Sequence, residues 1–444
     1  MIHLFSIFPF LLFLIVNTTE AQTNQGPNIL VIVPDDLGWS DVGYQGSEIL
    51  TPNIDRLARN GKILEQFYVM PTCTPTRVSL MTGKFPSRFG VLAPAYGEVI
   101  DLGAPTLPSL LQEAGYFTAI VGKWHMGSPP YTPLKYRFDQ SYGYFDGQID
   151  PYTHEYKTET AQTDRKSWHR NDHYLEEEGH VTDLLTAEAV AIIREPREKP
   201  FFLYLAHHVP HYPLDEPKKY LSLYDDRPQM HPSRKLFAAS VSHLDEGIGK
   251  ILQALEETGQ RENTVILFLS DNGGQKSWSS TDQYRGKYAD KPHVVLGNNF
   301  PLRGWKGDLY EGGIRVPGII NWEGRLPSGK ISVPIHMSDW LPTLLEISGT
   351  TTQEANQLDG ESVWTYLQNP QTRPATARSF YWKIKGASAV RQGDWKLVVR
   401  EDGRTELYQL KDDFRETQDQ SKQHPNKVKS LMTLLESYQK SDRD

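Results

Sequence analysis

The chain has 444 residues, of which 38% are hydrophobic and 23% are charged, and its formal net charge is −8. A chain of this length is too long to fold around one ordinary hydrophobic core, so we expect one large domain and a second, smaller one. The negative balance argues against nucleic acid as a partner, because phosphate backbones attract a surplus of Lys and Arg. It does not exclude a small anionic ligand, since a few cations in one cleft can outweigh the average surface.

The N-terminus has the pattern of a targeting segment. Residues 4–16 are apolar but too few to span a bilayer comfortably, and the small-x-small site Thr19-Glu20-Ala21 follows them. We expect a cleaved signal peptide at residues 1–21, with a short uncleaved anchor as the alternative, because no Lys or Arg precedes the apolar stretch. No later stretch is long enough for a membrane helix, so the expected protein is exported, periplasmic or secreted, without stable membrane insertion. A single cysteine excludes an intramolecular disulfide, which fits a bacterial exported protein better than an animal one.

Short apolar stretches then alternate with amphipathic ones. The apolar stretches are rich in β-branched residues, which is typical of parallel strands that are buried on both faces. The pattern predicts strands at residues 28–33, 117–121, 201–206 and 264–269, and helices at residues 51–60, 73–83, 106–114 and 240–258. This alternation indicates an α/β fold in which helices sandwich a large, mostly parallel sheet.

The C-terminal part has a different pattern. A polar segment at residues 350–378 leads out of the large domain. Apolar stretches around turns then predict strands at residues 387–400 and 405–410, and a helix follows at residues 426–440. We therefore expect a large domain at residues 22–370 that carries the functional site. A small C-terminal α+β subdomain at residues 371–444, with an antiparallel sheet and one helix, should follow it.

Polar residues follow the predicted strands where each strand ends. Asp35-Asp36 comes after the first strand and Asp271-Asn272 after the fourth. Ligands of such folds bind beyond the carboxyl ends of the strands, so these residues are expected to meet. Three carboxylates and an amide oxygen suit a hard cation such as Ca²⁺ or Mg²⁺, of which we expect Ca²⁺, and no array of His or Cys favours zinc. The alternative is that the acidic pairs are merely solvated.

Two further motifs carry reactive side chains. Cys73-Thr74-Pro75-Thr76-Arg77 opens the helix that ends before Gly83, so Cys73 is expected at a helix N-terminus, where an anion is favoured. A buried structural cysteine is the alternative. Gly122-Lys123-Trp124-His125-Met126-Gly127 follows a buried strand, and its Lys123 and His125 are expected to point to the same side of an extended segment.

These motifs resemble those of the type I sulfatases. The Cys-x-Pro-x-Arg core marks a cysteine for oxidation in that family, and the chain also carries its Gly-Lys-Trp-His-x-Gly motif, its His-x-Pro pattern at His211 and its lysine signature around Lys306. The similarity runs from residue 28 to about residue 345, and its nearest branch is arylsulfatase B-like, which includes many enzymes that act on sulfated polysaccharides. It implies an alkaline-phosphatase/sulfatase-like fold.

The resemblance assigns roles to individual residues. Cys73 becomes formylglycine (3-oxoalanine) through a formylglycine-generating enzyme, and with Asp35, Asp36, Asp271 and Asn272 it binds the metal. In the family, one hydroxyl of the hydrated aldehyde attacks sulfur, and the other later expels sulfate. The implied catalytic set is Cys73, Arg77, Lys123, His125, His211 and Lys306, with Asp271 as a base, His211 or Lys306 as the acid and His125 assisting sulfate release. Glu311 and Arg315 are expected to form a structural ion pair.

The resemblance leaves the substrate open. Aromatic and cationic residues in loops 142–170 and 275–300 predict a rim for an anionic sugar, with substrate contacts from His154, His208 and Arg285. His208 is also the alternative to His211, and His207 is expected to be buried support. A sulfated oligosaccharide or polysaccharide, algal such as ulvan or carrageenan rather than a glycosaminoglycan, is the expected substrate. The alternatives are a phosphonate or phosphodiester hydrolase of the same superfold, an inactive glycan-binding relative, and ordinary surface loops in place of the rim.

Overall fold

The computed structural model describes residues 26–156, 165–277, 296–350, 352 and 355–443. The predicted signal peptide at residues 1–21 lies outside this range, and so does Arg285. Within the described residues, no helix is both long enough and apolar enough to cross a membrane.

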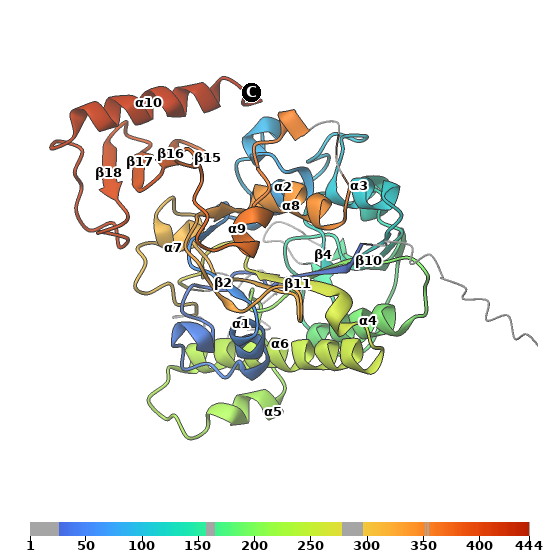
Figure 1. The fold of residues 1–444 in the computed structure, drawn as a ribbon. Coiled ribbons are helices and arrows are strands. Elements are labelled where there is room, and N and C mark those ends of the chain that lie inside the picture. The colour runs from blue at the N-terminus through green and yellow to red at the C-terminus, as the bar shows by residue number, and fades with distance from the viewer. Residues whose placement is uncertain (1–25, 157–164, 278–295, 351, 353–354, 444) are drawn as a thin grey trace, which may run out of the picture.

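A large sheet forms the centre of the molecule, and its middle strands are parallel as predicted (Figure 1). β1 pairs in parallel with β10 and β11, and β4 pairs in parallel with β10 and β5. β12 pairs antiparallel with β11, and β8 pairs antiparallel with β5. The order across the sheet is β13 (Gly329–Ile331), β2 (Lys62–Leu64), β12 (Gly318–Asn321), β11 (Thr264–Leu269), β1 (Asn28–Val33), β10 (Phe201–Ala206), β4 (Phe117–Lys123), β5 (Gln140–Tyr144), β8 (Trp168–Arg170) and β9 (His173–Tyr174).

Helices cover both faces of this sheet, because its central strands are apolar on both sides. Leu30 and Ile32 of β1 pack into the core beneath α1 (Pro52–Arg59), α4 (Val181–Arg194) and α6 (Pro232–Glu257). Ile29 and Val31 point to the opposite face of the sheet, because side chains alternate along a strand. The core on that face is covered by α2 (Cys73–Thr82), α3 (Leu107–Glu113) and α8 (Trp340–Ile347). In Figure 1 these two groups of helices lie on opposite sides of the sheet. The predicted α/β sandwich is confirmed.

A second sheet with one helix forms the C-terminal part, also as predicted. It is antiparallel in the order β15 (Ser379–Ile384), β16 (Ala387–Gln392), β17 (Trp395–Val399) and β18 (Thr405–Gln409), and α10 (Pro425–Gln439) lies on its outer face. The sequence pattern did not predict β15. The domain boundary near residue 370 stays a prediction.

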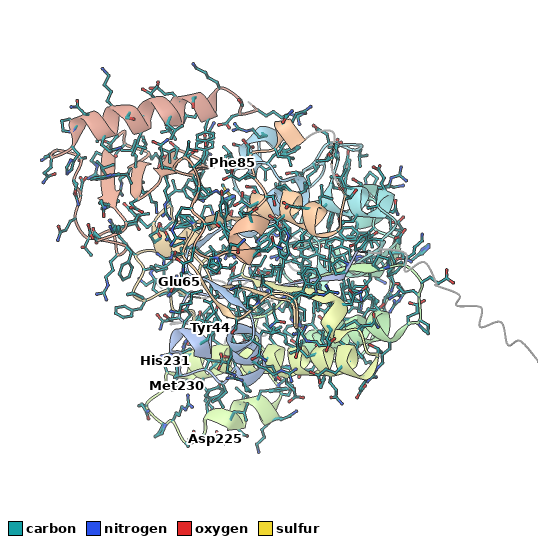
Figure 2. All side chains as sticks on the ribbon, in the orientation of Figure 1. Tyr44, Glu65, Phe85, Asp225, Met230 and His231 are labelled. Carbon is teal, nitrogen blue, oxygen red and sulfur yellow. The ribbon has the colours of Figure 1, made fainter. Side chains whose placement is uncertain are left out.

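The small sheet packs closely against the large domain. Trp382 of β15 joins a core with Tyr68 and Ile314, and its Nε1 donates a hydrogen bond to the Val69 carbonyl at 2.9 Å. On the other face, Phe85 from the large domain meets the rings of Tyr381 and Tyr438 edge-on. Figure 2 marks Phe85 where the large domain meets the small sheet. The two parts therefore share apolar core on both faces of the small sheet.

Several elements differ from the prediction in extent. α6 begins at Pro232, eight residues before the predicted start, because the His231 side chain caps it by accepting from the Ser233 amide. β4 continues to Lys123 and so carries that side chain into the sheet. The remaining short elements are β3 (Phe67–Tyr68), β6 (Glu155–Tyr156), β7 (Arg165–Lys166), β14 (Ile335–His336), α5 (Lys218–Leu221), α7 (Glu311–Ile314) and α9 (Trp364–Gln368).

Candidate active site

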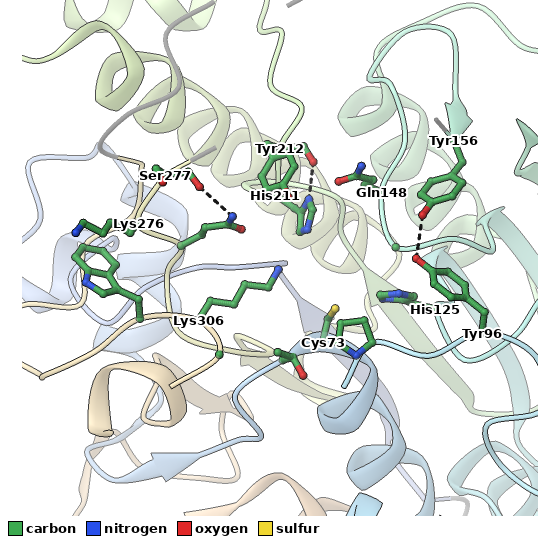
Figure 3. Close-up of a pocket in the computed structure, with 16 residues that line it drawn as sticks. Cys73, Tyr96, His125, Gln148, Tyr156, His211, Tyr212, Lys276, Ser277 and Lys306 are labelled. Atoms are coloured by element: carbon green, nitrogen blue, oxygen red, sulfur yellow. Dashed lines mark hydrogen bonds between the residues drawn. The ribbon is translucent and has the colours of Figure 1, made fainter. Parts of the chain in front are cut away.

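A pocket of about 550 Å³ opens beyond the carboxyl ends of the parallel strands. Cys73, His125, His211 and Lys306 all line it, so four residues from four separate motifs converge there. Figure 3 shows Lys306 and His211 on one side of the Cys73 thiol and His125 on the other. The other side chains on its wall come from Thr72, Pro94, Tyr96, Gln148, Tyr156, Tyr212, Gln275, Lys276, Ser277 and Trp305.

The predicted metal ligands meet at the floor of this pocket. Asp35, Asp36, Asp271 and Asn272 are all buried. The Asp36 amide donates to Asp271 Oδ1 at 3.2 Å, and Asn272 Nδ2 donates to Asp36 Oδ1 at 2.7 Å. Asp36 adopts φ = 70°, a left-handed backbone that is uncommon for a residue with a side chain and is found where a site imposes it.

This set of residues fits a hard divalent cation. Among the described residues, Asp35 Oδ1 and Asn272 Oδ1 are buried acceptors without a hydrogen-bond partner. Such atoms are costly to bury unless something occupies their lone pairs. Oxygen ligands from three carboxylates and one amide are the type that Ca²⁺ and Mg²⁺ bind.

Each carboxylate at the floor also has its own cation. Lys123 Nζ lies 2.6 Å from Asp35 Oδ2, and Arg77 Nη2 lies 2.7 Å from Asp271 Oδ2. Lys306 Nζ lies 2.6 Å from Asp36 Oδ1 and 2.8 Å from Oδ2. Three cations thus balance three carboxylates, and a bound divalent ion would leave a surplus of two positive charges. The floor of the pocket is therefore built to attract an anion.

These pairs shift the ionisation of their members. Burial alone would raise the pKa of Asp36, but Lys306 and His211 hold it below the usual value. Burial and the neighbouring Asp35 raise the pKa of Asp271. Burial opposes the charge on Lys306, yet Asp36 raises the pKa of that ammonium above its usual value. Lys306 is consequently charged at any physiological pH.

Cys73 is the first residue of α2 and is 2% exposed. Its thiol points into the pocket (Figure 3). Burial raises the pKa of the thiol, although Lys123 and Lys306 favour the thiolate. Arg77, one turn further along α2, donates hydrogen bonds to the Lys123 carbonyl and the Tyr204 hydroxyl, both at 3.1 Å, besides its ion pair. The helix thus links Cys73 to the carboxylates.

Two imidazoles flank the thiol. His211 Nε2 lies 3.7 Å from Asp36 Oδ2, and burial together with Lys306 lowers the pKa of His211 to about 3. Burial, with Lys123 and Arg77, lowers the pKa of His125 well below its usual value. Neither ring nitrogen of His125 has a hydrogen-bond partner among the described residues. Both imidazoles are therefore neutral in this structure and can accept a proton.

One geometric prediction about the Lys123 motif is wrong. Lys123 and His125 do not lie on one extended segment, because His125 adopts φ = 51°. Lys123 is still part of β4 and points beneath the pocket to Asp35, whereas the turn swings His125 onto the pocket wall. Gly122, with φ = 111°, starts this change of direction. The two side chains act at different depths of the same site.

Four of the predicted catalytic residues line the pocket, but the predicted substrate contacts within the described residues do not. His208 is fully buried, with Nδ1 3.3 Å from the Tyr144 hydroxyl, and does not line the pocket. His154 is 3% exposed, because it stacks on Trp168 with ring centroids 4.5 Å apart and its Nε2 contacts the Gly179 carbonyl. The structure therefore does not bring these two histidines to the pocket, and Arg285 lies outside the described residues. His207 is buried as expected.

The pocket wall includes aromatic residues that the sequence motifs did not single out. The hydroxyls of Tyr96 and Tyr156 lie 3.0 Å apart and join two loops beside His125 (Figure 3). Tyr156 belongs to the predicted rim 142–170, and Trp305 adjoins Lys306 in its signature, so both were within reach of sequence reasoning. Tyr96 lies in a loop without a motif, and no signal points to it.

Comparisons with known proteins agree with this geometry. The sulfatase family model matches residues 27–350. Mouse arylsulfatase J is 34% identical over 408 residues, which cover 88% of this chain and 64% of the relative. Dog N-acetylgalactosamine-6-sulfatase is 32% identical over 405 residues, which cover 85% of this chain and 72% of the relative. The chain therefore spans less than two thirds of the length of arylsulfatase J.

A solved structure extends the likeness to nearly the whole chain. The crystal structure of Ps i-CgsB in complex with k-i-k-neocarrahexaose matches with a TM-score of 0.81 and 31% sequence identity, over 94% of each chain. The match includes the small C-terminal sheet, because the large domain alone would not reach that coverage. The chain belongs to the sulfatase family, whose enzymes hydrolyse sulfuric esters.

Proposed function

We propose that this protein is a sulfatase that removes sulfate from a sulfated carbohydrate, with formylglycine at position 73 and a divalent metal ion in the site. The single observation that carries the proposal is that the charged and reactive side chains of separate motifs converge at the floor of one pocket. There the Cys73 thiol at the start of α2 faces three paired carboxylates, two neutral imidazoles and Lys306. A pocket with that charge arrangement stabilises the negative charge that develops on a transferred sulfuryl group.

The metal ligands in this proposal are Asp35, Asp36, Asp271 and Asn272, with the side chain at position 73 completing the set. The ion, Ca²⁺ rather than Mg²⁺, supplies positive charge that polarises the sulfate oxygens. Hydrated formylglycine would supply two hydroxyls, one that attacks sulfur with Asp271 as the base and one that later expels sulfate, whereas the Cys73 thiol has no second hydroxyl for that release.

The side chains that can transfer protons lie on two sides of position 73. Lys306 and His211 lie on the Asp36 side, where the charged Lys306 can deliver a proton to the leaving alcohol, and the neutral His211 can do so once it has taken up a proton. His125 lies on the other side, and as a neutral imidazole it can take a proton during sulfate release. Lys123 and Arg77 lie beneath them and hold Asp35 and Asp271 in place.

A sulfated oligosaccharide derived from a polysaccharide is the proposed substrate. The wall of the pocket combines aromatic faces from Tyr96, Tyr156 and Trp305 with the exposed cation of Lys276, a combination that suits an anionic sugar. Ps i-CgsB binds a neocarrahexaose, which supports an algal galactan such as carrageenan, with ulvan as a second algal candidate. Because the chain is also similar to N-acetylgalactosamine-6-sulfatase, sulfated amino sugars are included among the substrates to be tested.

The decisive experiment measures the chemical state of position 73 and activity together. Protein from the native host is digested and the peptide containing residue 73 is analysed by mass spectrometry, and turnover of an aryl sulfate is compared with that of an aryl phosphonate and an aryl phosphate diester. We expect the aldehyde, a strong preference for the sulfate ester, and loss of activity both in Cys73→Ala and after chelation, with Ca²⁺ restoring only the chelated enzyme. An intact thiol in fully active protein would contradict the mechanism, and preference for the phosphonate or diester would contradict the activity.

A panel of defined sulfated oligosaccharides then tests the substrate. Release of sulfate from carrageenan- or ulvan-derived oligosaccharides is the expected result. Binding without any sulfate release, by protein that carries the aldehyde, would instead indicate a glycan-binding relative.

We also propose that the protein is exported and that a formylglycine-generating enzyme modifies it. The apolar segment at residues 4–16 and the Thr19-Glu20-Ala21 site support export. N-terminal sequencing of the protein from cell fractions of the host is expected to find a chain that begins at Gln22 outside the cytoplasm. A chain that keeps residues 1–21 and sediments with membranes would favour the uncleaved anchor.

A further inference from the structure

His125 keeps its place on the pocket wall without a side-chain hydrogen bond. Its ring is 3% exposed, and neither ring nitrogen has a hydrogen-bond partner among the described residues. A hydrogen bond to one nitrogen usually orients a histidine in an active site, as the contact of His211 Nδ1 with the Tyr212 carbonyl does in this pocket. Packing must therefore orient the ring of His125.

Tyr96 packs against this imidazole. The ring centroids of Tyr96 and His125 lie 5.7 Å apart, and the ring planes are inclined by 51°. The Tyr96 hydroxyl lies 3.0 Å from the hydroxyl of Tyr156, at the end of β6, and Figure 3 shows the two hydroxyls meeting beside His125. Tyr96 is itself 52% exposed, so the contact with Tyr156 steadies a ring that burial alone would not fix.

Gly147 lies at the edge of the same imidazole. A Cβ atom at this position would stand 2.7 Å from His125 Nε2 and 2.8 Å from Cε1, which is closer than non-bonded atoms can approach. The backbone of Gly147 is not left-handed, so the conformation of the chain does not call for glycine there. What the position provides is the absence of a side chain. The His125 amide donates a hydrogen bond to the Phe145 carbonyl at 3.0 Å, which keeps the segment of Gly147 in register with the ring.

Thr74 fixes the Tyr96 loop to the backbone of His125. Its hydroxyl donates a hydrogen bond to the His125 carbonyl at 3.0 Å and accepts one from the Ala95 amide at 3.4 Å, next to Tyr96. Thr74 is also the second residue of α2, directly after Cys73. The loop, the imidazole and the reactive position are thus held at fixed distances from one another.

We propose that Tyr96 and Gly147 are positioning residues for His125, Tyr96 by contact with the ring and Gly147 by leaving room for it. The inference rests on the proposed function. In that reaction sulfate leaves with the electron pair of its bond to residue 73, the remaining hydroxyl of this residue gives its proton to His125, and the aldehyde is restored. The imidazole can accept the proton only within hydrogen-bond reach. Since a displacement of about 1 Å can cost about 100-fold in rate, the two residues set the rate of sulfate release.

Crystal structures of two variants test the packing directly. Gly147→Ala pushes against the end of the His125 side chain, which can swing aside, and Tyr96→Ala removes a half-exposed ring, so both variants are expected to fold. With Cys73 unmodified, each should show the His125 ring displaced from its position on the pocket wall. Tyr96→Phe keeps the ring contact and is the matched control, in which His125 should stay in place. An unmoved ring in both alanine variants would refute the positioning role.

Rapid mixing of aldehyde-bearing protein with an aryl sulfate separates the two chemical steps, because the aryl alcohol leaves in the first step and sulfate in the second. Sulfate release should slow by about 10–100-fold in Gly147→Ala and by about tenfold in Tyr96→Ala, and Tyr96→Phe should stay within about twofold of the unaltered protein. One equivalent of aryl alcohol should still appear quickly in each variant. A small aryl ester keeps sugar contacts of Tyr96 out of the measurement. Equal slowing of the first step would contradict the proposal.

A double-mutant cycle with His125→Ala shows whether the two residues act through the imidazole. Once the imidazole is absent, neither Gly147→Ala nor Tyr96→Ala should slow sulfate release further, and additive losses would refute the proposal. Absence of aryl sulfate turnover in the unaltered, aldehyde-bearing protein would instead refute the proposed function. The crystal structures would then still decide whether Tyr96 and Gly147 hold the ring, so the two failures can be told apart.

Discussion

At the scale of single residues, the floor of the pocket pairs every carboxylate with a separate cation. Buried pairs of this kind add little net stability, but removal of one partner leaves an uncompensated charge and costs about 3–5 kcal/mol. Arg77 and Lys123 are fully buried in such pairs, whereas the Lys306 side chain is 15% exposed and borders the cavity. Lys306 is therefore the cation whose removal should affect catalysis more than folding.

Lys306→Ala tests that distinction. The variant should lower kcat for an aryl sulfate by about 10²–10³-fold, because one preorganised charge disappears from the place where the sulfuryl group sits. The matched control is Lys276→Ala, which removes an exposed lysine from the rim of the same pocket and should change kcat less than tenfold. Steady-state kinetics with both variants decides the matter, and equal effects on kcat would place the critical charge elsewhere.

At the scale of elements, the end of β4 depends on close contact with its neighbours. Gly122 has φ = 111°, and a Cβ atom there would lie 1.9 Å from the Ala206 carbonyl oxygen of β10. That oxygen belongs to a buried strand and cannot move aside. The glycine thus allows β4 to turn where Lys123 goes to the floor and His125 to the wall.

Gly122→Ala should consequently destabilise the fold by about 2–4 kcal/mol, because it combines a clash with a strained backbone. Gly115→Ala, two residues before β4, is the control, since its φ of 90° is equally left-handed but a Cβ atom there meets nothing within 4 Å. That change should cost about 1–2 kcal/mol. Denaturant unfolding of both variants measures the difference, and equal costs would show that the contact with β10 is unimportant.

The small sheet meets the large domain through a buried charge cluster. Lys396 of β17 lies 3.0 Å from Glu311 Oε1 and 2.7 Å from Glu416 Oε1, and Arg315 approaches Glu311 at 3.6 Å, which confirms the expected Glu311–Arg315 pair. Burial, reinforced by the negative charge of Glu311, raises the pKa of Glu416 to about 7 despite Lys396. The folded chain therefore binds a proton at Glu416 more tightly than the unfolded chain.

A group with a raised acid pKa stabilises the fold at low pH and loses that contribution as the pH rises through the folded-state value. Between pH 5 and pH 8 the free energy of unfolding should therefore fall by about 1–3 kcal/mol on account of Glu416. Glu416→Gln cannot ionise, so its stability relative to the unaltered protein should improve over that interval by the same amount. Unfolding titrations at the two pH values measure this gain, and a constant difference between the proteins would contradict it.

At the scale of the whole molecule, the C-terminal sheet is part of the structure that supports the site. Trp382 is fully buried against Tyr68 and donates a hydrogen bond to the Val69 carbonyl, four residues before Cys73. The segment that delivers Cys73 to the pocket thus rests on the small sheet. A predicted boundary near residue 370 describes a change in topology rather than a separation of two independent units.

Trp382→Ala should lower the free energy of unfolding by about 3–5 kcal/mol, and the loss should affect both parts of the chain in one transition. Trp382→Phe keeps one aromatic ring but removes the hydrogen bond and part of the buried volume, so a smaller loss of about 1–3 kcal/mol is expected. Thermal unfolding followed by calorimetry distinguishes one transition from two. A variant in which the small sheet melts alone while the large domain keeps its melting temperature would disprove this dependence.

The sequence predicted the central architecture because its strands are apolar on both faces, and such stretches have few alternatives. Asn28–Val33, Phe201–Ala206 and Thr264–Leu269 agree with the structure residue by residue. β15 escaped prediction because it directly follows a polar segment, and its burial depends on contacts with Tyr68, more than 300 residues away.

The site was predictable to the extent that it consists of local motifs. Cys73, His125, His211 and Lys306 all lie within such motifs and reach the pocket, and His125 and His211 do so because they follow β4 and β10, whose ends are fixed by the sheet. His154 and His208 did not, since the chemistry of a histidine does not reveal whether an aromatic neighbour such as Trp168 or Tyr144 will enclose it. Contacts that depend on packing between loops, such as Tyr96 with Tyr156, leave no periodic signal in the sequence.

The separation along the chain between Arg77 and its carboxylate partner has a consequence for biosynthesis. Asp271 lies 194 residues after Arg77, so a ribosome that adds about 5–20 residues per second needs about 10–40 s to supply it. During that interval β1 also lacks β11, and the pocket around the thiol lacks the wall that residues 275–277 and 305–307 provide. The modifying enzyme proposed above would reach Cys73 most readily while the polypeptide is nascent or still open, and conditions that hasten closure should then lower the yield of converted chains.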